Sequence, residues 1–257
     1  MKISGDLTER ACDGLAIIIV LVMPGSSWAK ILWKGDFETK DLSQWSGTLS
    51  PATESRQNIT IVDSPAFEGK HAAQIVIHPD DIFPKGHSRV ELRYEGKRTA
   101  EGQTTFFSWR FQLPKNAQVH EDVAYWETKG SEFRQSMAFY VGPVDGGTQL
   151  GFRTNLPVVR QYWKATITVG EWHQLAMRIT WAKNEERGRV SVWFDGKQVI
   201  DDVAAQTKPN DADLFIQTGF HRDSSKVPVE TIYLDDAIEG TSLQDILLPT
   251  APVRKAR

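Results

Sequence analysis

The sequence predicts an all-β protein, an antiparallel sandwich of two sheets in one domain. First, short stretches of alternating polar and apolar residues recur from about residue 57 to about residue 238, separated by clusters of Gly, Pro, Asn and Asp. Second, no long helical pattern follows residue 30. Third, the 257 residues are 40% hydrophobic and 25% charged, which suffices for a large two-sheet core.

The N-terminal segment is expected to be separate from this domain. The run Leu15–Met23 is the only long apolar one, and it is too short to span a bilayer comfortably. Ser27 and Ala29 supply small residues at the −3 and −1 positions of a cleavage site. Residues 1–29 are therefore expected to be a signal peptide, which makes the mature protein secreted or periplasmic. The alternative is a buried N-terminal helix or strand.

The mature chain is expected to consist of one domain, residues 30–249, and a frayed tail, residues 250–257. The single cysteine, Cys12, lies in the expected signal peptide, so the fold does not depend on disulfides. Losing residues 1–29 removes two basic and three acidic residues and changes the net charge from −3 to −2. Attraction for a polyanion must therefore be local. We expect a monomer with no membrane span and no nucleic-acid partner.

Two segments carry the clearest strand signals. Along residues 105–113, Phe107, Trp109 and Phe111 alternate with less apolar residues until Pro114 ends the strand. Along residues 189–200, Asp195-Gly196 separates two alternating runs, which predicts a hairpin.

The segment 86–94 is the most informative for function. Its alternation places one set of polar side chains on one face of a strand: His87, Arg89, Glu91 and Arg93. An exposed outer sheet face would show a similar pattern. Guanidinium groups, however, suit bidentate binding of a sugar carboxylate, and Glu91 is placed to hold one of them.

Further strands add polar residues to the same expected surface. Residues 123–130 place Tyr125, Glu127 and Lys129 together, with Trp126 facing the opposite way, and residues 214–223 place Gln217, Gly219 and His221 on one face. Two more strands contribute Tyr140, Arg153, Tyr162 and Lys164, opposite apolar residues that include Trp163. The pattern predicts a concave sheet lined by Arg, His, Tyr and Glu. His120 is expected in a loop or at an edge.

The order of several motifs resembles the heparin lyase I-like polysaccharide lyases, whose relatives include glucuronan and alginate lyases on the concanavalin A-like jelly roll. The motifs are Gly35–Glu38 with Trp45, Ser88–Arg93, Phe107–Pro114, Gly170–His173, Val192–Lys197 and Tyr233–Asp236. The resemblance covers roughly residues 31–240 and implies a jelly-roll sandwich.

The resemblance also implies an activity, the cleavage of a uronic-acid-containing polysaccharide by β-elimination. Such lyases neutralise the uronate carboxylate, remove the C5 proton and protonate the leaving oxygen. Arg89 and Glu91 match the family's Arg-x-Glu strand, and His87 lies where related glucuronan lyases carry a histidine.

The chain departs from the family at two motifs. Tyr125-Trp126-Glu127 stands where relatives often have Gln-x-His, and Gln217-Thr-Gly-Phe-His221 stands where they have Lys-x-Gly-x-Tyr. Tyr125 or His221 is then expected to be the base, and His87 or His221 the acid. The expected catalytic residues are His87, Arg89, Tyr125 and His221. The expected substrate-binding residues are Glu91, Arg93, Glu127, Lys129, Tyr140, Arg153, Tyr162, Lys164 and Gln217.

Other functions stay open at this point. The exchanged residues are also compatible with a non-catalytic carbohydrate-binding protein on the same scaffold. A retaining glycoside hydrolase would need two nearby carboxyl groups, for which Glu91 and Glu127 are the only plausible pair. No cofactor is required for β-elimination. The carboxylates Asp36, Glu38, Asp235 and Asp236 are either ligands of a structural calcium ion or solvated turn residues.

Overall fold

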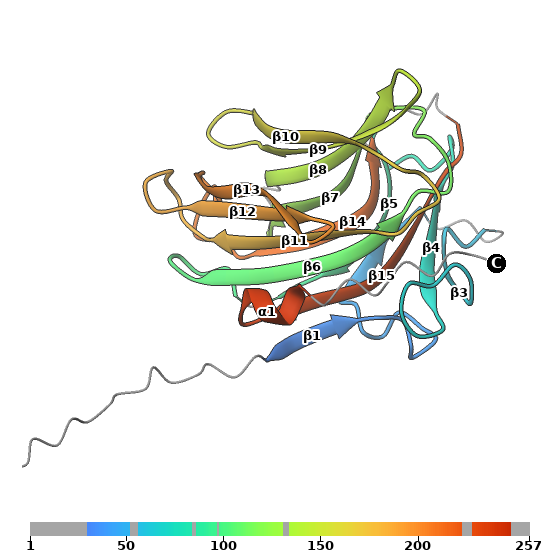
Figure 1. The fold of residues 1–257 in the computed structure, drawn as a ribbon, viewed down its shortest axis with the longest axis horizontal. Helices are drawn as coiled ribbons and strands as arrows, with labels where there is room; N and C mark the ends of the chain where they lie inside the picture. The colour runs from blue at the N-terminus through green and yellow to red at the C-terminus, as the bar shows by residue number, and fades with distance from the viewer. Residues whose placement is uncertain are drawn as a thin grey trace, which may run out of the picture.

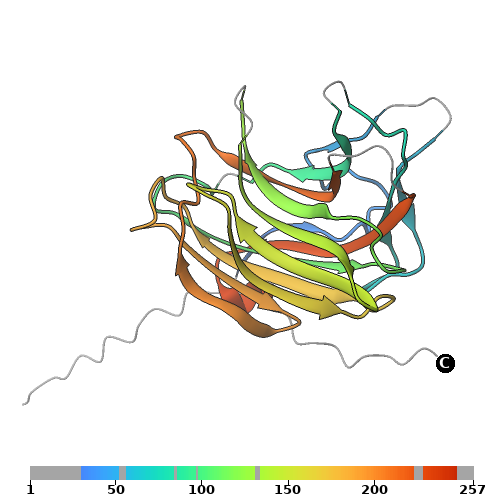
Figure 2. The same cartoon turned by 90° about the horizontal axis from the view of Figure 1, so that it is seen from above.

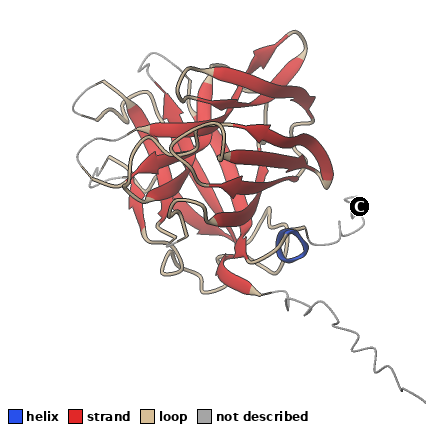
Figure 3. Ribbon diagram, turned by 90° about the vertical axis from the view of Figure 1, so that its left-hand side faces the viewer, coloured by secondary structure: helices blue, strands red, loops and turns tan. Residues whose placement is uncertain are grey.

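The computed structural model describes residues 30–51, 56–83, 86–96, 98–130, 134–222 and 228–247. The expected signal peptide, Cys12 and the expected C-terminal tail lie outside the described residues. Nearly all of the described secondary structure is β, as predicted, and one short helix, α1 (Leu243–Ile246), follows the last strand (Figure 3). No described helix has the length and apolarity needed to cross a membrane.

The described strands form two antiparallel sheets that face each other (Figures 1 and 2). The eight-stranded sheet has the order β13-β12-β11-β6-β15-β4-β3, and β1 also pairs with β15. Its strands are β1 (Ile31–Gly35), β3 (Ile59–Val62), β4 (Ala72–Ile77), β6 (Thr104–Gln112), β11 (His173–Thr180), β12 (Arg189–Phe194), β13 (Lys197–Ala204) and β15 (Glu230–Gly240).

The seven-stranded sheet has the order β10-β9-β8-β7-β14-β5-β2. Its strands are β2 (Gly47–Leu49), β5 (Ser88–Tyr94), β7 (Glu121–Thr128), β8 (Gln135–Val144), β9 (Gly147–Thr154), β10 (Arg160–Ile167) and β14 (Leu214–Arg222). Neighbours in each sheet are often distant in sequence, such as β14 between β7 and β5, as expected for a jelly roll.

The core lies between the two sheets. Phe107 and Trp109 of β6 meet Trp126 of β7 edge to face, with ring centroids 6.3 and 6.1 Å apart, and Trp109 meets Phe139 of β8 at 5.4 Å. All four rings are buried. The predicted alternation of β6 and the predicted inward direction of Trp126 are therefore confirmed.

The predicted hairpin between β12 and β13 is also confirmed. Phe194 pairs with Lys197, and Asp195 and Gly196 between them have φ values of 48° and 77°. Two consecutive positive φ angles are typical of the type I′ turn that matches the twist of paired strands.

Two irregularities in the seven-stranded sheet decide which side chains leave the core. The pairing of β7 shifts between Asp122 and Ala124, so Asp122 pairs with Tyr140 while Val123 is buried. The pairing of β10 shifts between Gln161 and Trp163. A bulge changes the face that each following side chain occupies, so simple alternation fails at both places.

Candidate active site

The polar face of the seven-stranded sheet, defined as the face turned away from the eight-stranded sheet, carries two rows of side chains across the strands. One row, given by direct pairing, is Arg89, His221, Asp122, Tyr140, Gly151 and Lys164. A second row is Arg93, Gln217, Tyr125, Ala138, Arg153 and Gln161, and the pair of Glu91 and Gly219 lies between the two rows on β5 and β14. Residues from six strands therefore share one surface, although they lie far apart in the sequence.

Arg89 of β5 is the centre of a hydrogen-bonded network. Its Nε donates to Oε2 of Glu91 at 2.9 Å, and one Nη donates to the hydroxyl of Tyr125 and lies 3.4 Å from Oε2 of Glu127. Gln217 closes the network, because its Nε2 donates to Oε2 of Glu127 at 2.7 Å and to the Tyr125 hydroxyl at 2.9 Å. The guanidinium group is thus held in a fixed orientation before any ligand binds.

The burial of this network changes how its members ionise. Glu91 is completely buried, and this burial raises its pKa to about 7 against the opposing effect of Arg89. Burial likewise raises the pKa of Glu127. The pKa of the Tyr125 hydroxyl lies well above its ordinary value because of burial and of the adjacent Glu91 charge. Tyr125 is therefore a protonated hydroxyl at neutral pH, and it makes a hydrogen bond with Glu91.

Burial lowers and neighbouring carboxylates raise the pKa of Arg89, and the net result is a pKa above the ordinary value. The guanidinium therefore stays charged. A positive charge held in a fixed orientation is the kind of group that stabilises negative charge developing on a bound carboxyl group.

Two imidazoles lie beside the network. The ring centroid of His221 in β14 is 5.5 Å from that of Tyr125 and 5.4 Å from that of His87, which directly precedes β5. The side-chain amide of Gln135 lies 3.2 Å from Nδ1 of His221. When the amide nitrogen donates to Nδ1, the neutral ring carries its proton on Nε2; when the amide is turned over, Nδ1 carries the proton and donates it to the amide oxygen. Arg89, Tyr125, His221 and His87 thus converge at one place.

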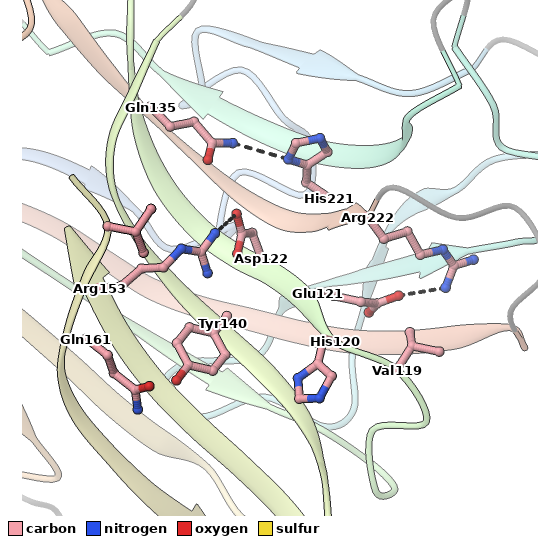
Figure 4. A pocket seen from close by; sticks show the side chains of 11 residues that line it. Val119, His120, Glu121, Asp122, Gln135, Tyr140, Arg153, Gln161, His221 and Arg222 are labelled. Carbon is pink, nitrogen blue, oxygen red and sulfur yellow. Dashed lines mark hydrogen bonds and ion pairs between the residues drawn. The ribbon is translucent and has the colours of Figure 1, made fainter. Parts of the chain in front are cut away.

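A pocket of about 730 Å³ opens next to His221 (Figure 4). It is lined by Val119, His120, Glu121, Asp122, Gln135, Tyr140, Arg153, Val159, Gln161, His221 and Arg222. Arg153 is held from two sides, since one Nη donates to Oδ2 of Asp122 at 2.8 Å and Nε donates to Oδ1 of Asn155 at 3.1 Å. The pocket therefore continues the polar surface from β14 toward β10.

Several expected substrate-binding residues lie away from this centre. Arg93 and Lys129 both bind Glu95, with nitrogen–oxygen distances of 3.2 Å each. Lys164 is exposed and pairs with Gly151, which places it on the polar face near its edge. Tyr140 and Arg153 line the pocket. The structure thus divides the expected residues between the Arg89 network, the pocket and the sheet margins.

The expected position of Tyr162 is wrong. Its hydroxyl donates to the backbone carbonyl of Ala204 in β13 at 3.1 Å, and its ring packs against the hydrophobic core. The bulge at Gln161 and Trp163 is the physical reason, because it places Gln161 rather than Tyr162 opposite Arg153. The ring of Trp163 lies 5.3 Å from that of Phe194 in β12, so it faces inward as expected.

The structure also brings in residues that sequence reasoning missed, namely Asp122, Gln135, Gln161 and His120. Asp122 and Gln161 reach the pocket only through the two bulges, which no local pattern in the sequence indicates. Gln135 contacts His221 across two strands, and His120 lies just before β7. Knowledge of the strand pairing, which no local pattern in the sequence indicates, would have been needed to find these residues.

The four carboxylates predicted either to bind calcium or to be solvated have protein partners; they are Asp36, Glu38, Asp235 and Asp236. Oε1 of Glu38 accepts from the backbone N–H groups of Lys70 and His71, at 2.7 and 2.9 Å. Oδ2 of Asp235 accepts from the backbone N–H groups of Phe67 and Glu68, at 2.8 and 3.1 Å.

Asp36 and Asp236 share the ammonium group of Lys34, at 3.1 and 3.7 Å. Within the described ranges, no group of three or more His, Cys, Asp or Glu is placed to hold a metal ion. A calcium site formed by these four carboxylates stays a prediction.

These features define the class of the protein as a jelly-roll sandwich with a polar, arginine-centred site on one sheet. The family model described as Polysaccharide lyase matches residues 37–237. The chain therefore belongs to the polysaccharide lyase family. No curated protein matches the sequence significantly.

Solved structures with the same fold have low sequence identity to this chain. An endo-β-1,4-glucuronan lyase from the fungus Trichoderma reesei has a TM-score of 0.66 and 16% identity, covering 84% of this chain and 98% of its own. The catalytic domain of a glycoside hydrolase family 131 protein from Coprinopsis cinerea has a TM-score of 0.59 and 17% identity, covering 82% and 94%.

A family 7 alginate lyase, A1-II′, solved as a double variant in complex with substrate, has a TM-score of 0.54 and 12% identity, covering 72% and 82%. At these identities the three structures show the shared fold alone, and the family assignment depends on the sequence match.

Proposed function

We propose that the protein is a secreted polysaccharide lyase that cleaves a uronic-acid-containing polysaccharide by β-elimination. The observation that carries the proposal is the convergence of Arg89, Tyr125, His221 and His87 on one face of one sheet. Opposite sheets would have separated the groups that bind the carboxylate from those that move protons. Membership of the polysaccharide lyase family and the fold shared with a glucuronan lyase support the same class of substrate.

In the proposed mechanism, Arg89 binds the uronate carboxylate, and the buried Tyr125 holds the guanidinium group in place. Removal of the C5 proton moves negative charge onto the carboxyl oxygens, where a fixed cation lowers the barrier most. Tyr125 is a poor base, because its pKa is raised and its oxygen already accepts hydrogen bonds from Arg89 and Gln217.

His221 is then the base and His87 the acid. His221 takes the C5 proton, the C–H electron pair forms the C4=C5 double bond, and the C4–O bond breaks. His87 in its protonated form gives a proton to the leaving oxygen. The accepting nitrogen is Nε2, in the tautomer whose ring proton is on Nδ1. That proton is donated to the side-chain oxygen of Gln135 when its amide is turned over, and the contact fixes the ring orientation for this step.

Ultraviolet absorbance of the unsaturated product tests the proposal on glucuronan, alginate and heparin. We expect product from at least one of them, and a decrease in kcat of about 10²-fold or more for His221→Gln. Arg89→Lys keeps the charge but loses the fork of donors, so we expect a decrease in kcat/KM of about 10- to 100-fold. Arg187→Lys is the matched control, since Arg187 forms an exposed ion pair with Glu101. Absence of product on every polyuronate would exclude the lyase.

A non-catalytic carbohydrate-binding protein is the second candidate. It is favoured by one observation, that Arg89 already contacts two carboxylates, Glu91 and Glu127. These carboxylates offset the positive charge that would stabilise the reacting carboxyl group. Binding of a polyuronate without any unsaturated product, unchanged in His221→Gln, would support this candidate over the lyase.

A further inference from the structure

Two aromatic side chains in the pocket lie directly over glycines. A Cβ placed on Gly151 of β9 would come within 2.7 Å of Cε1 of Tyr140 and closer still to its Cζ and hydroxyl. A Cβ placed on Gly142 of β8 would lie 2.9 Å from Cγ of His120 and closer to its Nδ1. Real Cβ atoms do not approach other heavy atoms so closely, so each ring occupies space that only glycine leaves open.

A glycine at each of these two strand positions destabilises the sheet. Glycine inside a strand has no side chain to pack and loses more conformational freedom on folding than other residues. Gly142 and Gly151 both lie well inside their strands, where they pair with Gln149 and Tyr140. A strand glycine often marks a close approach of another group, and here that group is an aromatic ring in both cases.

Both rings line the pocket (Figure 4), and their glycines are close in the sheet, because Gly142 lies two residues beyond Tyr140 in β8 and Tyr140 pairs with Gly151. The part of the pocket lined by the two rings is called its floor. Tyr140 is half-buried and His120 is exposed, so neither ring belongs to the core. The guanidinium group of Arg153 lies over one part of the Tyr140 ring, with its Cζ 5.4 Å from the ring centroid, and is held by Asp122. An aromatic floor beside fixed polar groups suits a pyranose ring, whose faces carry C–H groups and whose edges carry hydroxyl and carboxylate groups.

The floor lies beside the proposed catalytic groups and does not coincide with them. His221 pairs with Asp122 and Asp122 pairs with Tyr140, so His221 and Tyr140 are two strands apart on the same row. At the usual strand spacing this separation is about 10 Å. A sugar resting on Tyr140 is therefore a different unit from the one whose C5 proton faces His221.

We propose that His120 and Tyr140, seated on Gly142 and Gly151, form a sugar-binding platform for a unit of the polyuronate next to the cleaved one, and that Arg153 binds its carboxylate. The inference rests on the proposed function for the identity of the ligand. It adds a specificity site that would make the enzyme prefer chains long enough to reach from His221 to β9.

Kinetics on two lengths of one substrate test the platform. The probe is whichever of glucuronan, alginate or heparin gives product, compared with the shortest oligosaccharide of it that is still cleaved. For Tyr140→Ala and for His120→Ala we expect KM on the polysaccharide to rise about tenfold, kcat to change less than about threefold, and KM on the short substrate to stay unchanged. Tyr140→Phe keeps the ring and should restore the wild-type KM.

Gly151→Ala tests the close approach of the Tyr140 ring to this glycine, because the added methyl group must displace the ring. It should reproduce the KM effect of Tyr140→Ala. Tyr233→Ala is the matched control, since Tyr233 lies in the eight-stranded sheet, bonded to Gln74. Circular dichroism confirms that each variant is folded.

The outcomes separate this inference from the proposed function. Cleavage with an unchanged KM in Tyr140→Ala and His120→Ala overturns the platform and leaves the lyase in place. Absence of cleavage by the wild type, with polyuronate affinity that decreases about tenfold in Tyr140→Ala, overturns the lyase and supports the platform. Neither cleavage nor binding of any polyuronate by the wild type overturns both.

Discussion

Replacing Glu91 by glutamine should remove a pH dependence of stability that this buried carboxyl group imposes. The pKa of Glu91 is raised from 4.5 to about 7, chiefly by burial. Between these values the folded protein binds a proton that the unfolded chain releases, so the contribution to stability is present below about pH 4.5 and is lost as the pH rises through 7. At about 1.4 kcal/mol per pH unit, the full loss is about 3 kcal/mol.

Urea unfolding at pH 4.5, 6 and 8 measures this effect. Glutamine keeps an oxygen that accepts from Arg89 but cannot ionise, so the free energy of unfolding of the wild type should fall relative to Glu91→Gln by about 3 kcal/mol across this range. Other carboxyl groups with a raised pKa, such as Asp235 and Glu121, are present in both proteins, so their effects cancel in the difference between the two free energies of unfolding. Glu186→Gln, in the turn between β11 and β12, is the control. Parallel pH curves for wild type and Glu91→Gln would refute the reasoning.

Three further predictions concern Gly219, Lys34 and the N-terminal segment. Gly219→Ala should destabilise the fold by about 3 kcal/mol in urea unfolding, because Gly219 has φ of 141° and its Cβ would lie 2.9 Å from Cα of Glu91; wild-type stability would contradict this. Lys34→Met should lower the melting temperature by about 3 °C through loss of the bridge between Asp36 and Asp236, whereas EDTA should leave the wild-type value unchanged. A drop in the wild-type melting temperature with EDTA would favour the calcium site instead. Intact-mass analysis of secreted protein should show a chain that begins at Lys30, and retention of residues 1–29 would exclude the signal peptide.

The architecture was readable from the sequence because its signals are local. Alternation in β6 and the Asp195-Gly196 turn depend on residues a few positions apart, and the structure has both features where they were predicted. The face of β5 that carries Arg89 and Glu91 was readable for the same reason, since its register with β14 runs without a shift.

The limits of prediction coincide with the bulges. In β7 a single shift turns Asp122 toward the pocket, and in β10 another turns Tyr162 toward the core. A bulge is stabilised by the strands on either side, and here those strands lie elsewhere in the sequence. The composition of the pocket therefore depends on long-range pairing that alternation cannot supply.

The role of Tyr125 depends on its burial, which its place in the sequence does not reveal. The pattern places Tyr125, Gln217 and Glu127 on the polar face, where the first could be a base. All three are buried, and their hydrogen bonds are directed at one another and at Arg89. A hydroxyl with a raised pKa stays protonated, and the oxygen of Tyr125 already accepts two hydrogen bonds, so Tyr125 is a poor base. Its hydrogen bond with Arg89 holds the guanidinium group in place. Proton abstraction then falls to His221, which borders both this network and the pocket where a sugar would lie.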